Sequence, residues 1–175
     1  MRMMRPSGRT VALVFALMLF AGGAAFVPVM LTLWKIAAAL AAGLVFLDFC
    51  RGCRPPGIEL KRNIQPILPV GVWSRVDLEF KNPENQALTL RVFDHYPAPC
   101  ETAAHPLSLT LPPGARQSAS YFVRPRKKGD MAFAGMDLLI RSPMALWWKK
   151  KAVAQREAIR VFPNFREIKK FTLLA

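Results

Sequence analysis

The chain has 175 residues, of which 53% are hydrophobic and 21% are charged. This length allows one ordinary domain beside a membrane or targeting segment and excludes a large multidomain enzyme, and a chain this apolar can bury enough surface to fold rather than stay disordered. Its 25 Lys and Arg residues against 11 Asp and Glu residues give a formal charge of +14, which predicts attraction to anionic surfaces, whether phospholipid or nucleic acid.

The first third of the chain is a long apolar segment. Residues 11–49 contain two charged residues, Lys35 and Asp48. As one helix at about 1.5 Å per residue this segment would be about 58 Å long, nearly twice the ~30 Å hydrocarbon core of a bilayer. A break near Pro28 divides it into two stretches of suitable length, roughly Thr10–Val27 and Leu33–Cys50. We therefore expect a two-helix transmembrane hairpin over residues 1–54.

The charges around this segment predict its orientation. Lys35 and Trp34 fall close to the expected turn of the hairpin, where an ammonium group reaches the far interface and avoids the bilayer centre. Basic residues flank both ends of the segment: Arg2, Arg5 and Arg9 before it, and Arg51, Arg54, Lys61 and Arg62 after it. By the positive-inside rule both ends face the cytoplasm. These patterns predict a multi-pass protein of the bacterial inner (plasma) membrane with a cytoplasmic soluble domain.

A cleaved signal peptide is an alternative interpretation of the first apolar stretch. Basic residues precede an apolar run that ends in the small residues Ala21, Ala24 and Ala25, as in such peptides. A signal peptide would not explain the second apolar stretch, which follows almost at once. The hairpin is therefore the leading interpretation.

After Pro55, Pro56 and Gly57 the apolar pattern changes to the period of a β-strand. The clearest example is Arg75–Lys81, where three apolar residues alternate with charged ones, as on a strand with one buried face. The pattern predicts seven short strands, within Ile58–Ile64, Arg75–Lys81, Leu88–Val92, Leu107–Leu111, Gln117–Val123, Met131–Arg141 and Ala158–Phe162. Turn sequences separate them: Asn82-Pro83, Pro112-Pro113-Gly114, Gly129-Asp130 and Ser142-Pro143.

Strands at this spacing predict an all-β fold, an immunoglobulin-like or fibronectin-like antiparallel β-sandwich, over residues 55–163. Cys100 is the only cysteine in the strand region. A disulfide-pinned immunoglobulin domain is therefore excluded, and packing must hold the core. Residues 164–175 have the pattern of the start of a following element, truncated at Ala175.

The order of these features resembles a known family. A basic N-terminus and an apolar hairpin are followed by ELKRNIQPILPVGVWSRVDLEFKN, LPPG, YFVRPRKKGDMAF, IRSPMALW and VFPNF. The most specific pieces are Arg124–Gly129, Ser142-Pro143 with Leu146, and Val161-Phe162-Pro163. Over nearly the whole chain this order is similar to the N-terminal half of the family catalogued as domain of unknown function number fifty-eight.

The resemblance implies two membrane helices, a β-sandwich and then a von Willebrand factor A-like domain. Similar proteins tend to be encoded beside AAA+ ATPases of the MoxR type and beside other A-domain or transglutaminase-like proteins, which are the partners it implies. This sequence lacks the A-like domain and contains no D-x-S-x-S metal-site motif. The metal-dependent adhesion function of an A-domain is therefore not carried over, and we expect no cofactor.

Two small clusters have reactive residue types, but neither predicts catalysis. Cys50-Arg51-Gly52-Cys53 is a C-x-x-C, which is redox active in a thioredoxin-like setting or holds zinc beside a second such pair. This sequence provides neither setting, so incidental reduced thiols are the simpler interpretation. Asp94-His95-Tyr96 has acid–base residue types without an indicated nucleophile or pocket, and we expect it to end a strand before Pro97. No hydrolase, zinc-protease, P-loop or dinucleotide motif is present, which favours a non-enzymatic protein.

Two basic runs form the candidate binding surface. They are Arg124, Arg126, Lys127 and Lys128, and then Lys149, Lys150 and Lys151 directly after Trp147 and Trp148. On a domain tethered to the cytoplasmic leaflet, each such cation gains about 1 kcal/mol from anionic lipid, so we expect the runs to orient the sandwich on the membrane. The alternative is a solvated hairpin tip with the tryptophans in the core. Nucleic-acid binding lacks a recognition helix, an RRM-like motif or a zinc finger to support it.

Together these patterns predict a non-enzymatic, membrane-anchored interaction or assembly module. The resemblance adds a MoxR-type AAA+ ATPase system, with A-domain proteins, as its partners. The alternatives are a basic domain that binds nucleic acid or anionic lipid, and a thiol redox protein that uses the C-x-x-C.

Overall fold

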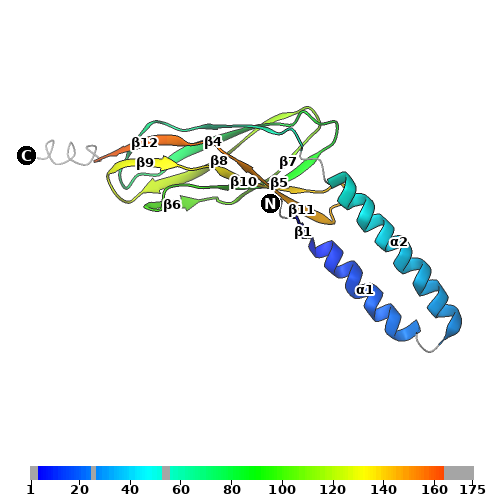
Figure 1. The fold of residues 1–175 in the computed structure, drawn as a ribbon. Helices are drawn as coiled ribbons and strands as arrows, with labels where there is room; N and C mark the ends of the chain where they lie inside the picture. Colours follow the sequence, from blue (N-terminus) through cyan, green and yellow to red (C-terminus); the bar gives the residue numbers. More distant parts are fainter. Residues whose placement is uncertain (1–3, 25–26, 53–55, 164–175) are drawn as a thin grey trace, which may run out of the picture. The chain divides into compact units, whose positions relative to one another are not determined.

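The structure is a computed structural model that describes residues 4–24, 27–52 and 56–163 (Figure 1). Two helices follow a short first strand, and the rest of the described chain is rich in strands. The chain divides into two compact units: unit 1 comprises Met1–Pro56 and Leu139–Lys151, and unit 2 comprises Gly57–Leu138 and Ala152–Ala175. Residues 164–175, predicted to begin a following element, lie outside the described part of the chain.

Unit 1 contains the two predicted helices, α1 (Gly8–Ala24) and α2 (Pro28–Gly52), which pack against each other. α2 is long and apolar enough to cross a membrane, and α1 is a shorter apolar helix of 17 residues. α2 begins at Pro28, whereas the prediction placed its start near Leu33. Proline is well tolerated in a first helical turn, because the N–H that it lacks would have no intrahelical partner there.

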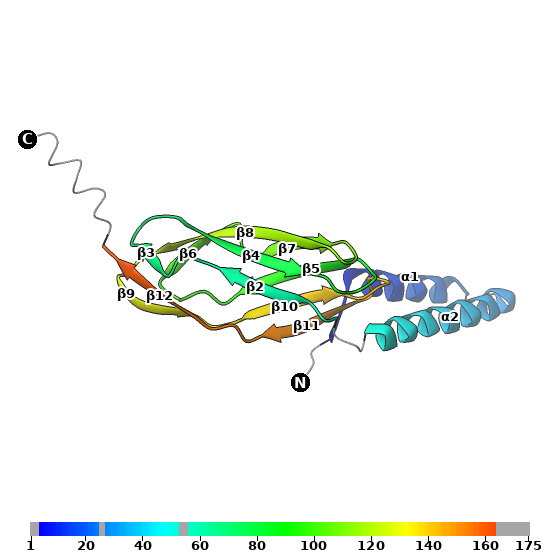
Figure 2. The same ribbon diagram turned by 90° about the horizontal axis from the view of Figure 1, so that it is seen from above.

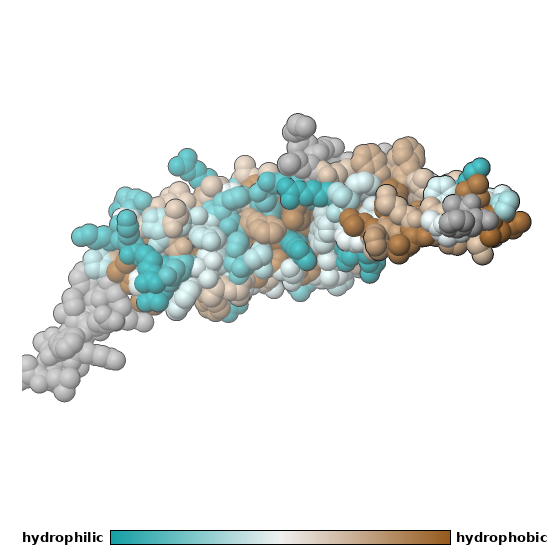
Figure 3. Space-filling model, turned by 90° about the horizontal axis from the view of Figure 1, so that it is seen from below, coloured by the Kyte–Doolittle hydropathy of each residue, from teal (hydrophilic) through white to brown (hydrophobic). Residues whose placement is uncertain are grey.

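Large apolar side chains on both helices point outward. Phe15, Met18, Leu40 and Phe46 are between 61% and 67% exposed, and hydrophobic residues gather on the surface of the hairpin in Figure 3. Between the helices, the Trp34 indole donates a hydrogen bond to the Leu17 carbonyl oxygen at 2.9 Å. The hairpin is therefore joined internally, while its outer faces lack a protein cover within unit 1.

Unit 1 also holds β1 (Met4–Pro6), which pairs in antiparallel fashion with β11 (Trp147–Val153). The boundary between the units falls within β11 and within β10 (Met136–Arg141). The turn that joins β10 to β11 belongs to unit 1, so a part of the chain far from the helices in sequence packs with them.

Unit 2 is built from strands. One sheet has the order β2-β4-β8-β6 and another has the order β3-β12-β9, while β5 pairs with β7. The remaining strands are β2 (Glu59–Asn63), β3 (Ile67–Pro69), β4 (Ser74–Lys81), β5 (Leu88–Asp94), β6 (Cys100–Ala103), β7 (Leu107–Leu111), β8 (Arg116–Pro125), β9 (Gly129–Phe133) and β12 (Glu157–Phe162). Figure 2 shows β2, β4 and β8 side by side in one layer. The pairs within that sheet are antiparallel, whereas β3 and β12 run parallel.

The inward faces of these strands form the core of unit 2. β4 buries Val76, Leu78 and Phe80, as the period-two pattern predicted. Tyr121 of β8 and Phe133 of β9 are among the largest fully buried side chains. The predicted fold class is confirmed: the chain is an immunoglobulin-like or fibronectin-like β-sandwich preceded by a helical hairpin.

The strand predictions differ from the structure in two respects. Met131–Arg141, predicted as one strand, forms β9 and β10 with a break at Ala134 and Gly135. A Cβ atom at Gly135 would lie 2.8 Å from the Val153 carbonyl oxygen, so the close approach of these two backbone segments requires glycine. The sequence also gave no signal for β1, β3, β6 or β11, which are short or lack regular alternation.

Candidate membrane-interface site

The turn Ser142–Leu146 is held by a buried carboxylate at the end of α2. Asp48 is fully buried. Its Oδ2 atom accepts hydrogen bonds from the Ser142 hydroxyl at 2.6 Å and the Leu146 N–H at 3.2 Å, and its Oδ1 atom accepts one from the Met144 N–H at 2.9 Å. Hydrogen bonds to a charged acceptor are worth about 1.5–3 kcal/mol each, and they offset the cost of burying the carboxylate. The sequence pieces Ser142-Pro143 and Leu146 therefore have a structural role as a clamp on α2.

The same turn is also held by the start of α1. The Ser7 N–H donates to the Leu146 carbonyl oxygen at 2.8 Å, and the Ser7 hydroxyl donates to the Ala145 carbonyl oxygen at 2.6 Å. The Thr10 hydroxyl donates to the Leu146 carbonyl oxygen as well. Ala145 has a φ of 62°, a left-handed conformation that costs free energy for a residue other than glycine and persists where surrounding contacts fix it. We call the hydrogen-bonded set Ser7, Thr10, Asp48 and Ser142–Leu146 the helix clamp.

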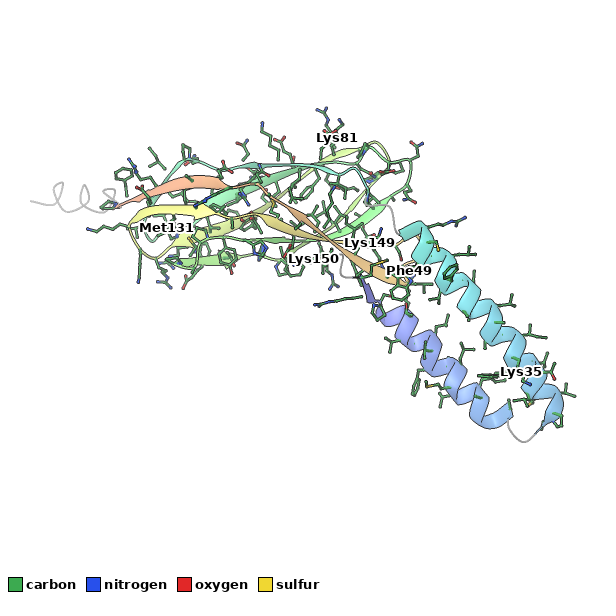
Figure 4. All side chains as sticks on the ribbon, viewed as in Figure 1. Lys35, Phe49, Lys81, Met131, Lys149 and Lys150 are labelled. Atoms are coloured by element: carbon green, nitrogen blue, oxygen red, sulfur yellow. The ribbon has the colours of Figure 1, made fainter. Side chains whose placement is uncertain are left out.

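Cationic side chains surround the clamped end of the hairpin. Arg5 lies in β1, Arg9 lies in the first turn of α1, Arg51 lies in the last turn of α2, and Lys149 is the β-ladder partner of Met4. We call Arg5, Arg9, Arg51, Lys149, Lys150 and Lys151 the basic collar. Asp48 is the only acidic residue among the described residues of unit 1, and its carboxylate is occupied in the helix clamp. The remaining cation of the hairpin, Lys35, lies at its opposite end from Phe49 and Lys149 (Figure 4).

The three lysines of the collar have different surroundings. The Lys149 side chain passes Gly52, with its Cε atom 3.7 Å from the position that a Cβ would take there, so its charge lies at the C-terminus of α2, where the helix dipole favours a cation. Lys151 donates from Nζ to the Pro56 carbonyl oxygen at 3.0 Å. Lys150 is exposed. The structure therefore gives Lys149 and Lys151 contacts with the end of α2 and the chain that follows it.

Aromatic side chains accompany the collar. The Trp147 indole donates to the Val45 carbonyl oxygen at 3.4 Å and meets the Phe49 ring edge-on at 5.6 Å between centroids. The Arg141 guanidinium lies 5.6 Å from the centroid of the Trp148 ring. Trp147 and Trp148 are half-buried. Half-buried tryptophans beside cations are typical of a membrane–water interface.

The other predicted basic run lies in unit 2. Arg124 donates from Nε to the Gly71 carbonyl oxygen at 2.8 Å, and Arg126 forms an ion pair with Glu101. Lys127 and Lys128 are exposed between β8 and β9. The two runs that the sequence placed on one lipid-facing surface therefore belong to different units, and each has its own surroundings.

Asp94 ends β5, as predicted, but its partners are not the neighbouring residues of the Asp94-His95-Tyr96 cluster. Arg62 of β2 pairs with the Asp94 carboxylate through two nitrogens, and both side chains are completely buried. The Tyr121 hydroxyl donates to Asp94 Oδ2 at 2.6 Å. Burial and the charge of Asp94 raise the pKa of Tyr121, which keeps this hydroxyl protonated as a donor. Sequence reasoning missed Arg62 and Tyr121 as partners, although residue 94 continues the alternation that buries Leu90 and Val92.

The two histidines have separate environments. His95 contacts Asp137, with 3.0 Å between Nε2 and Oδ2, and its side chain is 52% exposed. His105 accepts a hydrogen bond at Nε2 from the Asp94 N–H at 2.9 Å. Burial lowers the pKa of His105, against the opposing effect of Asp94, which fits a neutral, accepting ring. The Asp94 carboxylate and the His105 ring are therefore engaged in hydrogen bonds within unit 2.

The cysteines show no paired chemistry in the described chain. Cys50 is an exposed free thiol at the end of α2, and Cys100 is a buried free thiol whose pKa is raised by burial. Cys53, the second cysteine of the C-x-x-C, lies outside the described residues. Among the described residues, no group of three His, Cys, Asp or Glu side chains could hold a metal ion.

Comparisons with known proteins found similarity to solved structures alone. No family model and no curated protein matches the chain. Escherichia coli α2-macroglobulin activated by porcine elastase is similar at 20% identity and a TM-score of 0.46, over 61% of this chain and 9% of that one. The CARDB domain of a Pyrococcus furiosus protein in complex with di-metal ions is similar at 10% identity and a TM-score of 0.41, over 62% of this chain and 96% of that one. A FixG-related protein from Vibrio parahaemolyticus is similar at 8% identity and a TM-score of 0.41, over 62% of this chain and 97% of that one.

Proposed function

We propose that this chain is a non-enzymatic protein of the bacterial inner membrane that tethers a cytoplasmic β-sandwich as an interaction module. The observation that carries the proposal is the basic collar, a set of six cations. The described part of unit 1 contains a single acidic residue, Asp48, and its side chain is buried. A one-sided cluster of cations at the end of two apolar helices is what the positive-inside rule associates with the cytoplasmic leaflet.

The exposed faces of the helices support lipid as their solvent. Burying a large apolar side chain is worth about 1.5–3 kcal/mol, and α1 and α2 carry many that the described chain leaves exposed. α1, at 17 residues, is at the short end of the range that spans a bilayer. The buried Asp48 does not oppose this arrangement, because its hydrogen bonds keep it at the clamped end of α2 and not at mid-membrane.

The collar gives this anchor an anionic-lipid contact. Each Lys or Arg near the surface contributes about 1 kcal/mol of attraction to anionic headgroups. Since Lys149 contacts the end of α2 and Lys151 contacts the chain that follows it, the test changes Arg5, Arg9 and Lys150. In nanodiscs, alanine at these three positions should lower the preference for spin-labelled phosphatidylglycerol over phosphatidylcholine, whereas alanine at Lys61, Lys81 and Arg116 of unit 2 should not. Equal effects of the two triple variants would contradict a collar-specific contact.

The partners proposed for the module come from the family resemblance. Ser142 and Leu146, two of the residues that carry it, are two of the three residues that donate hydrogen bonds to Asp48 in the helix clamp. This gives the motif a physical reason within the anchor, and the resemblance that it carries implies a MoxR-type AAA+ ATPase and A-domain proteins as the partners.

Membrane fractionation tests the anchor. The chain should stay in the membrane pellet after extraction with alkaline carbonate, and peptide mass spectrometry should find residues 1–25 retained in it. A shortened chain that starts after Ala24 or Ala25 would establish the signal-peptide interpretation instead. Recovery of the intact chain in the soluble fraction would refute the membrane anchor altogether.

A further inference from the structure

Four large apolar side chains remain exposed among the described residues of unit 2. They are Ile67, Trp73, Phe122 and Phe162, with exposures of 58%, 46%, 42% and 42%. Single exposed apolar residues are ordinary on a protein surface. Their distribution is informative here, because these four residues come from separate parts of the sequence: β3, the segment after β3, β8 and β12.

Phe122 and Arg124 lie on the same face of β8, because the residues on either side of Phe122, Tyr121 and Val123, are buried on the other face. Backbone contacts bring the other three apolar residues to the same part of unit 2. Phe162 is the ladder partner of Pro69, and its carbonyl oxygen accepts from the Val70 N–H at 2.8 Å. The Gly71 N–H donates to the Pro125 carbonyl oxygen at 2.8 Å, and the Arg124 guanidinium lies 6.0 Å from the centroid of the Trp73 ring. The segment 67–73 therefore connects the end of β12 with the end of β8.

The excess positive charge of unit 2 lies at the same place. Five cations and two acidic residues belong to it: Arg124, Arg126, Lys127, Lys128 and Arg160, with Glu101 and Asp130. Elsewhere in the described part of unit 2, seven cations balance seven acidic residues. Arg126 pairs with Glu101 and Arg160 pairs with Asp130, so the excess comes from Arg124, Lys127 and Lys128. We call these seven charged residues, with Ile67, Trp73, Phe122 and Phe162, the aromatic–basic patch.

We propose that the aromatic–basic patch docks an acidic protein segment that carries apolar side chains. The inference supplies the partner chemistry of the interaction module and rests on that part of the proposed function. Trp, Phe and Arg are the residue types enriched at protein interfaces and their hot spots. The charge excess requires acidic groups on the partner, and the exposed apolar residues provide sites for its apolar side chains.

The mixed charges of the patch favour a protein over a phosphate-rich partner. Glu101 and Asp130 would repel the phosphates of a lipid surface or a nucleic acid, whereas a protein segment can present both signs of charge. The chain's own residues 164–175 are a poor occupant, because they add Arg166, Lys169 and Lys170 against one acid, Glu167.

Binding of a defined peptide to the full chain in phosphatidylcholine nanodiscs tests the proposal. The probe is a fluorescein-labelled peptide rich in Glu, Leu and Phe, and its control replaces Leu and Phe with Ser. Fluorescence anisotropy should show at least tenfold tighter binding of the apolar peptide. Phe122→Ala should weaken that binding at least tenfold, as truncation of a hot-spot aromatic does.

A pair of double variants separates the patch from general charge. Lys127→Ala with Lys128→Ala should weaken binding at least tenfold, whereas Lys61→Ala with Arg116→Ala, which removes the same charge from the balanced part of unit 2, should change it less than twofold. All four side chains are exposed, and circular dichroism checks that the variants stay folded.

Three results would overturn the proposal. They are no binding of the apolar peptide, equal losses in the two double variants, and tighter binding of a single-stranded oligonucleotide or of phosphatidylglycerol vesicles than of the peptide. None of them alters the membrane fractionation of the chain, so the anchor and the patch fail independently.

Discussion

Replacing Asp48 with alanine should release the Ser142–Leu146 turn. The Ser142 hydroxyl and the Leu146 N–H are buried, so each would lose its acceptor at a cost of about 1–3 kcal/mol. The Met144 N–H is partly buried and can recover water. The local opening free energy should therefore fall by about 2–6 kcal/mol, since both buried donors lose their partner at once.

Hydrogen exchange measured by mass spectrometry reads this change directly. The Ala145 N–H donates to the Ser142 carbonyl oxygen and the Trp147 N–H donates to the Ser142 hydroxyl, so both amides report on the turn. A loss of 2 kcal/mol or more corresponds to exchange faster by about 30-fold or more. Asp48→Asn, which keeps one acceptor oxygen, should have a smaller effect.

Asp77→Ala is the matched control for this experiment. Its carboxylate also accepts from a hydroxyl and a cation, Ser120 and Arg75, but its side chain is 38% exposed, whereas Asp48 is fully buried. It should leave the exchange of Ala145 and Trp147 unchanged. Exchange within threefold of the parent chain in Asp48→Ala would show that the carboxylate does not hold the turn, and the helix clamp would be refuted.

Three further predictions concern unit 2. His105 has a pKa below its ordinary 6.5 because burial disfavours its charged form. The stability that its neutral ring contributes is therefore present above pH 6.5 and lost as the pH falls below that value toward the folded-state pKa. His105→Gln should flatten the decline of the unfolding midpoint between pH 7 and 5, and an unchanged decline would contradict this assignment. Tyr121→Phe removes a buried donor to Asp94 and should lower the free energy of unfolding by about 1–3 kcal/mol in urea titrations; no loss would show that the bond contributes nothing. Gly135→Ala places a Cβ against the Val153 carbonyl oxygen and should cost about 1–3 kcal/mol, and a neutral effect on the thermal midpoint would contradict the close approach.

Local sequence patterns predicted those helices and strands that have a regular alternation or a long apolar run of their own. Val76, Leu78 and Phe80 alternate with charges over a whole strand, and the side-chain alternation of a strand then fixes which face is buried. The length of the apolar segment required two helices, and Pro28 marked the division between them. β11 was missed because Trp147, Trp148 and three lysines follow one another without alternation.

The helix clamp could not be predicted because it depends on contacts between distant residues. Asp48 looked like an isolated charge at the end of an apolar helix, and its partners lie 94 to 98 residues further along the chain. The Arg62–Asp94 pair was closer to prediction, since Asp94 falls on the buried side of β5 and a buried carboxylate needs a partner. The partner itself came from β2, and no local pattern names it.

Part of the aromatic–basic patch could be predicted from the sequence. The basic run from Arg124 to Lys128 was evident, but its association with Trp73 and Phe162 follows from the pairing of β3 with β12 and from the contacts of the segment after β3. Without that association the run was grouped with Lys149–Lys151, which the structure assigns to the other unit.

The orientation of the hairpin in the membrane is tested most directly by thiol labelling in intact cells. In a chain whose three native cysteines are replaced by serine, single cysteines are placed at Val27, between the helices, and at Lys127, in the patch; both positions are exposed. The account predicts that a membrane-impermeant maleimide applied to cells with a permeabilised outer membrane labels position 27 at once, and labels position 127 only after lysis. Labelling of position 127 before lysis, or protection of position 27, would contradict a hairpin with both ends in the cytoplasm.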